Sequence, residues 1–111
     1  MSKKILLDEN MPQPLRLQLV GHTVITATYQ GWAGKSNGEL IGLAEAAGFD
    51  VMVTADQNLS YQQNMKGRKL ALVVLSTPNK KRVMTNAQRI VAAVNAAEIG
   101  GYTFSDFGLT P

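Results

Sequence analysis

Ile5-Leu6-Leu7-Asp8-Glu9 is a short apolar run that ends at two acidic residues. A second run, Val51-Met52-Val53-Thr54, leads to Asp56 in the same way. Both runs are too short for a typical helix and are apolar at almost every position, as expected of strands buried on both faces of a parallel sheet. Ligand sites of such sheets lie outside the carboxyl ends of the strands. We therefore expect Asp8, Glu9 and Asp56 to meet at one edge.

The rest of the chain predicts strands that alternate with helices. Strands are expected over residues 3–8, 22–28, 50–54, 69–75 and 102–104. This alternation implies right-handed crossovers and a mostly parallel sheet. We predict one α/β domain over residues 1–111 with a doubly wound, mostly parallel sheet of four or five strands, and with the first strand central.

Capping residues and glycines predict where helices begin and end between these strands. Asn10 is expected to cap a helix with Pro12 and Pro14 in its first turn. Ser36 and Glu39 have the capping-box spacing, as do Thr85 and Gln88. The helices that these boxes begin are expected to stop at Gly48 and at Gly100-Gly101, and residues 58–66 form a short polar helix or an irregular turn.

Composition narrows the class of protein. The chain has 111 residues, which fits a single domain, and no cysteine, which excludes disulfides and thiolate metal sites. No stretch approaches the roughly 20 apolar residues of a membrane span, and the basic start is followed by too short an apolar run for a secretory signal. We expect a cytoplasmic protein without a membrane partner. The net charge of +3 is compatible with a polyanionic partner.

A cluster of carboxylates at one edge would repel itself unless a cation or a shared proton occupied it. Hard divalent cations, Mg²⁺ or Mn²⁺, are the usual occupants. Asp8 is the first candidate ligand; its alternative is a helix cap or turn residue, a role that Asn10 could take instead. Asp56 is the second, and its alternative is an Asx-turn after the strand.

Other polar residues could complete this site. Glu9 could support it or pair with a basic side chain, and Thr54 could bond a carboxylate or simply suit a strand. Asn58 could offer its carbonyl oxygen as a metal ligand or cap a helix. Glu39 could reach the metal from a helix N-terminus, although the capping box with Ser36 explains it equally well.

Two further features are compatible with a nucleic acid partner. Lys80-Lys81-Arg82 follows the fourth strand and should lie at the same edge as the acids, where it could hold a phosphodiester backbone or form a solvated loop. Trp32 could stack on a base, but packing of its glycine-flanked loop is the stronger reading. His22, the only histidine, begins the second strand and should lie at the opposite edge.

Four segments together resemble the small stand-alone PIN-like proteins, relatives of VapC-type toxin ribonucleases. The resemblance covers about the first two-thirds of the chain, in matching order. The segments are Ile5-Leu6-Leu7-Asp8-Glu9-Asn10-Met11-Pro12, Gly21-His22-Thr23-Val24, Gly34 to Ser36 with Glu39-Leu40-Ile41 and Ala44, and Val53-Thr54-Ala55-Asp56.

The resemblance implies a three-layer α/β/α sandwich with a parallel sheet and an acidic edge site for Mg²⁺ or Mn²⁺. The implied activity is hydrolysis of RNA, often by the toxin of a toxin–antitoxin pair. It implies an antitoxin protein as a partner, while base rates favour a symmetric homodimer. Asp8 matches the family's first acidic position, Asp56 the acid after the third strand, and Glu39 the acid on a helix. Where the family pattern usually has a further Asp, this chain has Asn58.

Two alternatives remain open. A PIN-like module could bind RNA or an antitoxin-type protein without turnover, because Asn58 removes one negative charge. A phosphoacceptor receiver domain could use Asp8-Glu9, Asp56 and Ser76-Thr77. That class also needs a lysine at the end of the fifth strand, and residues 99–111 contain none.

Overall fold

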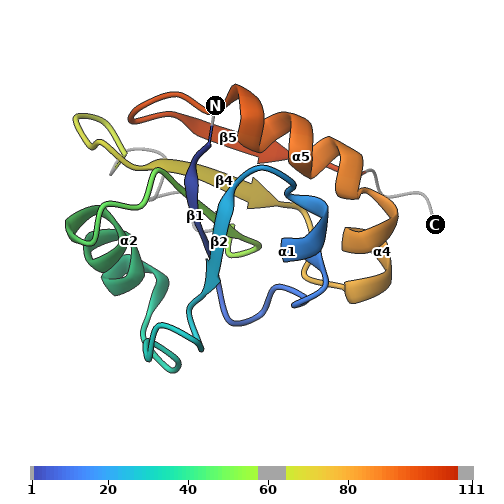
Figure 1. The fold of residues 1–111 in the computed structure, drawn as a ribbon, viewed down its shortest axis with the longest axis horizontal. Coiled ribbons are helices and arrows are strands. Elements are labelled where there is room, and N and C mark those ends of the chain that lie inside the picture. Colours follow the sequence, from blue (N-terminus) through green and yellow to red (C-terminus); the bar gives the residue numbers. More distant parts are fainter. Residues whose placement is uncertain (1, 58–64, 108–111) are drawn as a thin grey trace.

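Five strands form one parallel sheet in the computed structural model of the protein, which describes residues 2–57 and 65–107 (Figure 1). Their order across the sheet is β2-β1-β3-β4-β5. The strands are β1 Lys4–Leu7, β2 Thr23–Thr26, β3 Val51–Thr54, β4 Ala71–Leu75 and β5 Tyr102–Ser105. The predicted α/β class and the parallel sheet are confirmed, and β1 lies inside the sheet, between β2 and β3.

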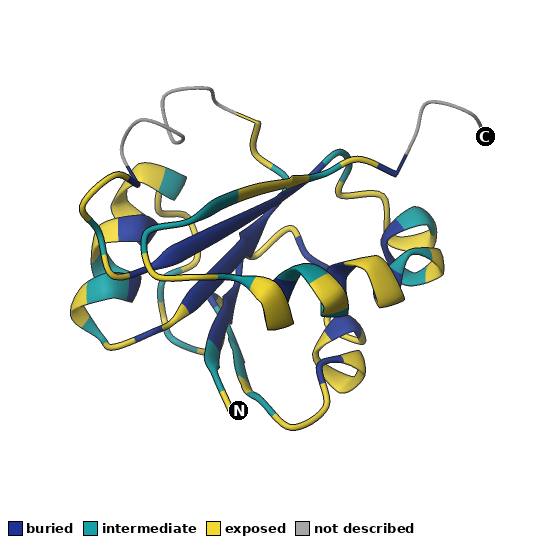
Figure 2. Ribbon diagram, turned by 90° about the horizontal axis from the view of Figure 1, so that it is seen from above, coloured by how far each residue is buried: buried dark blue, intermediate teal, exposed yellow. Residues whose placement is uncertain are grey.

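The alternation of side chains along each strand divides the core in two. Ile5 and Leu7 point to one face of the sheet, and Leu6 points to the other. Because β1, β3 and β4 are covered on both faces, almost all of their residues are buried, whereas the edge strands β2 and β5 are largely not (Figure 2). This is why the inner strands are apolar at successive positions.

Helices cover both faces of the sheet. α2, Asn37–Ala46, packs on the face of Leu6. The other face is covered by α1 Leu15–Gln18, α4 Lys80–Thr85 and α5 Ala87–Ala96. The predicted three layers are therefore present (Figure 1). Within the described ranges no helix has the length and apolarity needed to cross a membrane.

The first helix begins later than expected, and Asn10 does not cap it. α1 starts at Leu15 with Pro14 at the N-cap position and no side-chain cap. Met11 and Gln13 each precede a proline, whose ring disfavours the helical conformation of the residue before it. The segment before α1 therefore forms turns, with the Leu15 N–H donating to the Pro12 carbonyl at 3.0 Å.

The expected capping box of Thr85 and Gln88 is also wrong. Thr85 is the last residue of α4, which is capped instead by Asn79, whose side chain accepts from the Arg82 N–H at 3.1 Å. α5 has Asn86 at its N-cap position without a side-chain cap. The Asn86 side chain does not cap α5 because its Nδ2 donates back to the Arg82 carbonyl at 2.8 Å, at the end of α4.

Candidate functional site

The strand order places a switch point between β1 and β3. The chain leaves β1 toward β2 on one side and returns across β1 to β3 on the other. In open parallel sheets this reversal opens a crevice at the carboxyl ends of the two strands, where ligands bind. Asp8 follows β1 at that point, and its N–H continues the ladder by donating to the Val53 carbonyl at 3.1 Å.

A small cavity of about 190 Å³ lies at this edge of the sheet. Its lining residues come from segments that are far apart in the sequence, and four of the six are Asp or Asn. The lining residues are Asp8, Asn10, Asn37, Ala55, Asp56 and Pro78. The structure thus brings Asp8 and Asp56 together in one cavity.

Asp8 is a buried carboxylate, with only 3% of its surface exposed. Its Oδ2 accepts from the Thr54 hydroxyl at 2.5 Å, and its Oδ1 accepts from the Asn10 N–H at 2.7 Å. Both donors are neutral, and no lysine, arginine or histidine of the described residues pairs with Asp8. A buried carboxylate that lacks a positive partner favours uptake of a cation beside it.

Thr54 connects the two acidic residues. It is completely buried, and its hydroxyl group makes three hydrogen bonds. The O–H donates to Asp8, while the oxygen accepts from the Asp56 N–H at 3.1 Å and from Asn37 Nδ2 at 3.3 Å. A hydroxyl has one donor and two acceptor sites, so all of its capacity is used to fix the positions of its neighbours.

Asn37 is a site residue that the sequence reasoning missed. It is the first residue of α2, and its Nδ2 also donates to Asp56 Oδ2 at 3.0 Å. The expectation was that α2 would offer Glu39 to the site, but Asn37 is the residue of its first turn that lines the cavity. The signal that could have found it is its place beside Ser36, where a first-turn side chain of α2 can face the sheet edge.

Glu39 remains in the capping box of α2. Its Oε1 accepts from the Ser36 N–H at 3.3 Å and from the Ser36 hydroxyl at 3.1 Å. It does not line the cavity, and within residues 2–57 and 65–107 no group of three or more His, Cys, Asp or Glu side chains could hold a metal ion. The two carboxylates of Asp8 and Asp56 are therefore joined by the Thr54 hydroxyl and the Asn37 amide rather than by a third acid.

The other residues expected at the site are distributed around it. Glu9 turns toward the neighbouring loop, where its Oε1 accepts from the Gly34 N–H at 3.0 Å. Asn10 lines the cavity and donates its N–H to Asp8, closing an Asx-turn. Asp8 thus has both of the roles considered for it, the turn and the cavity. Asn58 lies outside the described residues.

Trp32 packs against the core. Its ring lies edge-on to Phe49, with 6.0 Å between centroids and 62° between planes, and it is partly buried against the α2 face of the sheet. The packing alternative is therefore confirmed for Trp32. His22 lies away from the cavity: its Nδ1 accepts from the Lys3 N–H at 2.9 Å and its Nε2 pairs with Asn95 Oδ1 at 2.7 Å.

The basic run belongs to a helix and not to a loop. Lys80 and Lys81 are exposed on the first turn of α4, and Arg82 is partly buried on the same helix. The turn begins directly after Pro78, which lines the cavity, and Asn79. The run therefore starts beside the edge that carries Asp8 and Asp56, and Lys80 and Lys81 are open to solvent there.

The side chains around the cavity that can offer oxygen donors are the carboxylates of Asp8 and Asp56 and the amides of Asn37 and Asn10. Oxygen donors suit hard divalent cations such as Mg²⁺ and Mn²⁺, and the chain offers no thiolate for softer metals.

No protein-family model, curated protein or solved structure matches this chain.

Proposed function

We propose that the protein is a metal-dependent endoribonuclease whose active site is the cavity at the carboxyl ends of β1 and β3. One observation carries the proposal: Asp8 and Asp56, which follow two different strands, line one cavity, and the buried Asp8 carboxylate has only neutral partners. The resemblance of the N-terminal segments to PIN-like ribonucleases supports the same chemistry. On that resemblance we propose a toxin that acts on cytoplasmic RNA and is neutralised by an antitoxin protein.

The residues fit Mg²⁺ or Mn²⁺. Proteins usually hold Mg²⁺ through one or two carboxylates, with waters and substrate phosphates as the remaining ligands. Asp8 and Asp56 supply two, and Asn37 and Asn10 line the same cavity. When bound, the ion supplies a lowered pKa for water and neutralisation of charge on phosphoryl oxygens.

The protein's own residues orient the reactants. Thr54 and Asn10 fix the two oxygens of Asp8, and Asn37 fixes Asp56, so the carboxylates need little reorganisation when charge develops. Lys80 and Lys81 extend from the turn after Pro78 and would attract the phosphodiester backbone.

The experiment is cleavage of single-stranded RNA with Mn²⁺, with Mg²⁺ and with chelator, by the wild type and by Asp8→Asn. We expect metal-dependent cleavage that falls roughly 10³-fold or more in the variant. Asp50→Asn is the matched control, because it makes the same change at the other end of β3, where the side-chain oxygen accepts from the Lys4 N–H at 2.8 Å. Cleavage by Asp8→Asn at the wild-type rate would falsify the proposal.

A second candidate is a binding module without turnover. The observation that favours it is that the described part of the site combines two carboxylates with the Asn37 amide and has no third acid. If the protein is such a module, the wild type should bind RNA or a protein partner. The wild type and Asp8→Asn should both be folded, and neither should cleave RNA with any metal.

The strand order does not separate these candidates from a receiver domain, because receiver domains share it. Two features count against a receiver. β5 ends at Ser105 and is followed by Asp106 and Phe107, with no lysine to contact a phosphoryl group. The hydroxyl of Ser76, after β4, accepts from the Phe107 N–H at 3.1 Å and so holds the chain after β5.

A further inference from the structure

β2 is an edge strand, and no other strand of the described residues pairs with its outer side. The Thr23 N–H donates to the Lys3 carbonyl at 2.9 Å, and the Ala27 N–H donates to the Leu7 carbonyl at 2.8 Å. Backbone groups of alternate residues point to opposite sides of a strand, so those of Val24 and Thr26 point away from β1. The Thr26 carbonyl accepts from the Gln30 N–H at 3.1 Å. Among the described residues, the N–H groups of Val24 and Thr26 and the Val24 carbonyl have no hydrogen-bond partner and could pair with an added strand.

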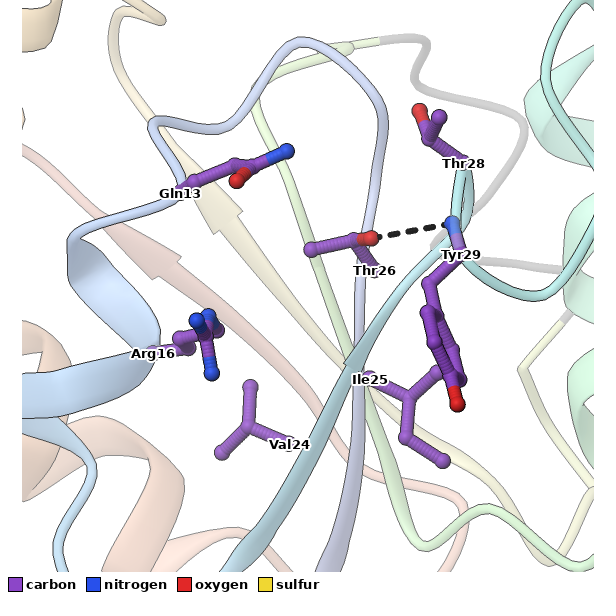
Figure 3. Close-up of a pocket in the computed structure, with 7 residues that line it drawn as sticks. All are labelled: Gln13, Arg16, Val24, Ile25, Thr26, Thr28 and Tyr29. Atoms are coloured by element: carbon purple, nitrogen blue, oxygen red, sulfur yellow. Dashed lines mark hydrogen bonds between the residues drawn. The ribbon is translucent and has the colours of Figure 1, made fainter.

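A cavity of about 440 Å³ lies along this edge (Figure 3). Side chains from both faces of the sheet line it: Gln13, Arg16 and Val24 lie on one side of β2, and Ile25 and Tyr29 lie on the other (Figure 3). The cavity therefore surrounds the edge of the sheet. A chain paired to β2 would pass through it with alternate side chains directed to the two sides, as in β-strand addition.

The charge of this edge selects an acidic occupant. β2 reads Thr-Val-Ile-Thr and carries none of the charges or prolines that usually protect an edge strand from pairing. Arg16 is the only charged residue that lines the cavity, and within the part of the chain that the structure describes it has no carboxylate partner. The whole chain carries a net charge of +3. An incoming segment with a carboxylate beside Arg16 would satisfy that charge.

We propose that the β2 edge binds an extended, acidic segment of a partner protein as an added strand, with one of its carboxylates on Arg16. A second copy of this chain fits less well. An isologous pairing of two β2 edges would bring two uncompensated Arg16 side chains and two net positive chains into one interface. This inference does not rest on the nuclease proposal, because no residue of the Asp8–Asp56 cavity takes part.

The test selects short random peptides from a display library on the full-length protein. We expect enriched peptides to be rich in β-branched residues and to carry Asp or Glu. Arg16→Glu should weaken their binding roughly tenfold or more, because it turns a charge-assisted bond into repulsion. Val24→Pro should weaken it similarly, because proline removes an outward N–H while Thr23 and Ala27 keep the pairing to β1.

Phe104→Pro is the matched control on the other edge. The Leu72 N–H donates to the Gly101 carbonyl and the Ser76 N–H donates to the Ser105 carbonyl, so Phe104 also points away from its neighbouring strand. This variant and Asp8→Asn should bind the peptides as the wild type does. The inference is wrong if no peptide is enriched, or if binding survives both Arg16→Glu and Val24→Pro. A dimer that Val24→Pro dissolves, without peptide binding, would overturn it in favour of a second copy.

Discussion

The two ends of the sheet differ in the partners of their charged side chains. At the amino end, Lys3 Nζ donates to the carbonyls of Val94, Asn95 and Ala97, between 2.7 and 3.1 Å, and completes the end of α5. Glu45 pairs there with Arg68 at 2.9 Å. At the carboxyl end, Asp8 is buried among neutral donors only. Charges that complete helix ends stabilise the fold, whereas a buried charge left with neutral partners indicates a place for a ligand.

Thr54→Val should produce the largest loss of stability. The side chains have similar shapes, but valine leaves Asp8 Oδ2, Asn37 Nδ2 and the Asp56 N–H without their shared partner. We expect a decrease of about 1–3 kcal/mol in the free energy of unfolding, measured by urea denaturation. RNA cleavage should fall as well. Wild-type stability in this variant would mean that the Thr54 network does not hold the acids in place.

Asn37→Asp tests whether the cavity at the carboxyl end binds a cation. It adds a carboxylate that faces Asp56, so without metal the like charges should lower stability. If the cavity binds cations, Mn²⁺ should restore that stability, and Mn²⁺ affinity should rise roughly tenfold. Calorimetric titration with Mn²⁺ and thermal unfolding with and without chelator measure both effects. An unchanged Mn²⁺ affinity would count against a cation in this cavity.

Lys3→Met tests the amino end alone. It keeps an unbranched stem but removes the donor to three carbonyls at the end of α5. A loss of about 1 kcal/mol in unfolding free energy is expected, with RNA cleavage unchanged. A loss of cleavage that exceeds the loss of folded protein would contradict the separation of stabilising and functional ends.

The strands were predictable because burial on both faces leaves a clear pattern. β1 and β3 are apolar at successive positions, and once they are taken as parallel, topology alone brings Asp8 and Asp56 to one edge. The Ser36 capping box was also predictable from the sequence, because its two residues, Ser36 and Glu39, lie within one turn. These inferences needed only local pattern and one rule about parallel sheets.

The contacts that were missed depend on packing or on competition between neighbouring signals. Asn37 reads as an ordinary first-turn residue, and its bonds to Thr54 and Asp56 depend on where α2 meets the sheet. The N-cap of α4 at Asn79 was not recognised because the capping-box spacing of Thr85 and Gln88 was the clearer signal, and only the side-chain bond of Asn86 to Arg82 decides between them.

The smallest effect is expected from pH at the amino end. The backbone N–H of Lys69, with help from the Arg68 guanidinium, lowers the pKa of Glu45 below its usual 4.5. A carboxylate with a lowered folded-state pKa contributes stability that is fully present above its unfolded pKa and is lost as pH falls through the folded value. Glu45→Gln should therefore be slightly less stable than the wild type at neutral pH, as for a surface ion pair, and the difference should shrink below about pH 4.5. Urea denaturation of both proteins at neutral and acidic pH measures it, and a difference that stays constant with pH would mean that the charge of Glu45 does not stabilise this end.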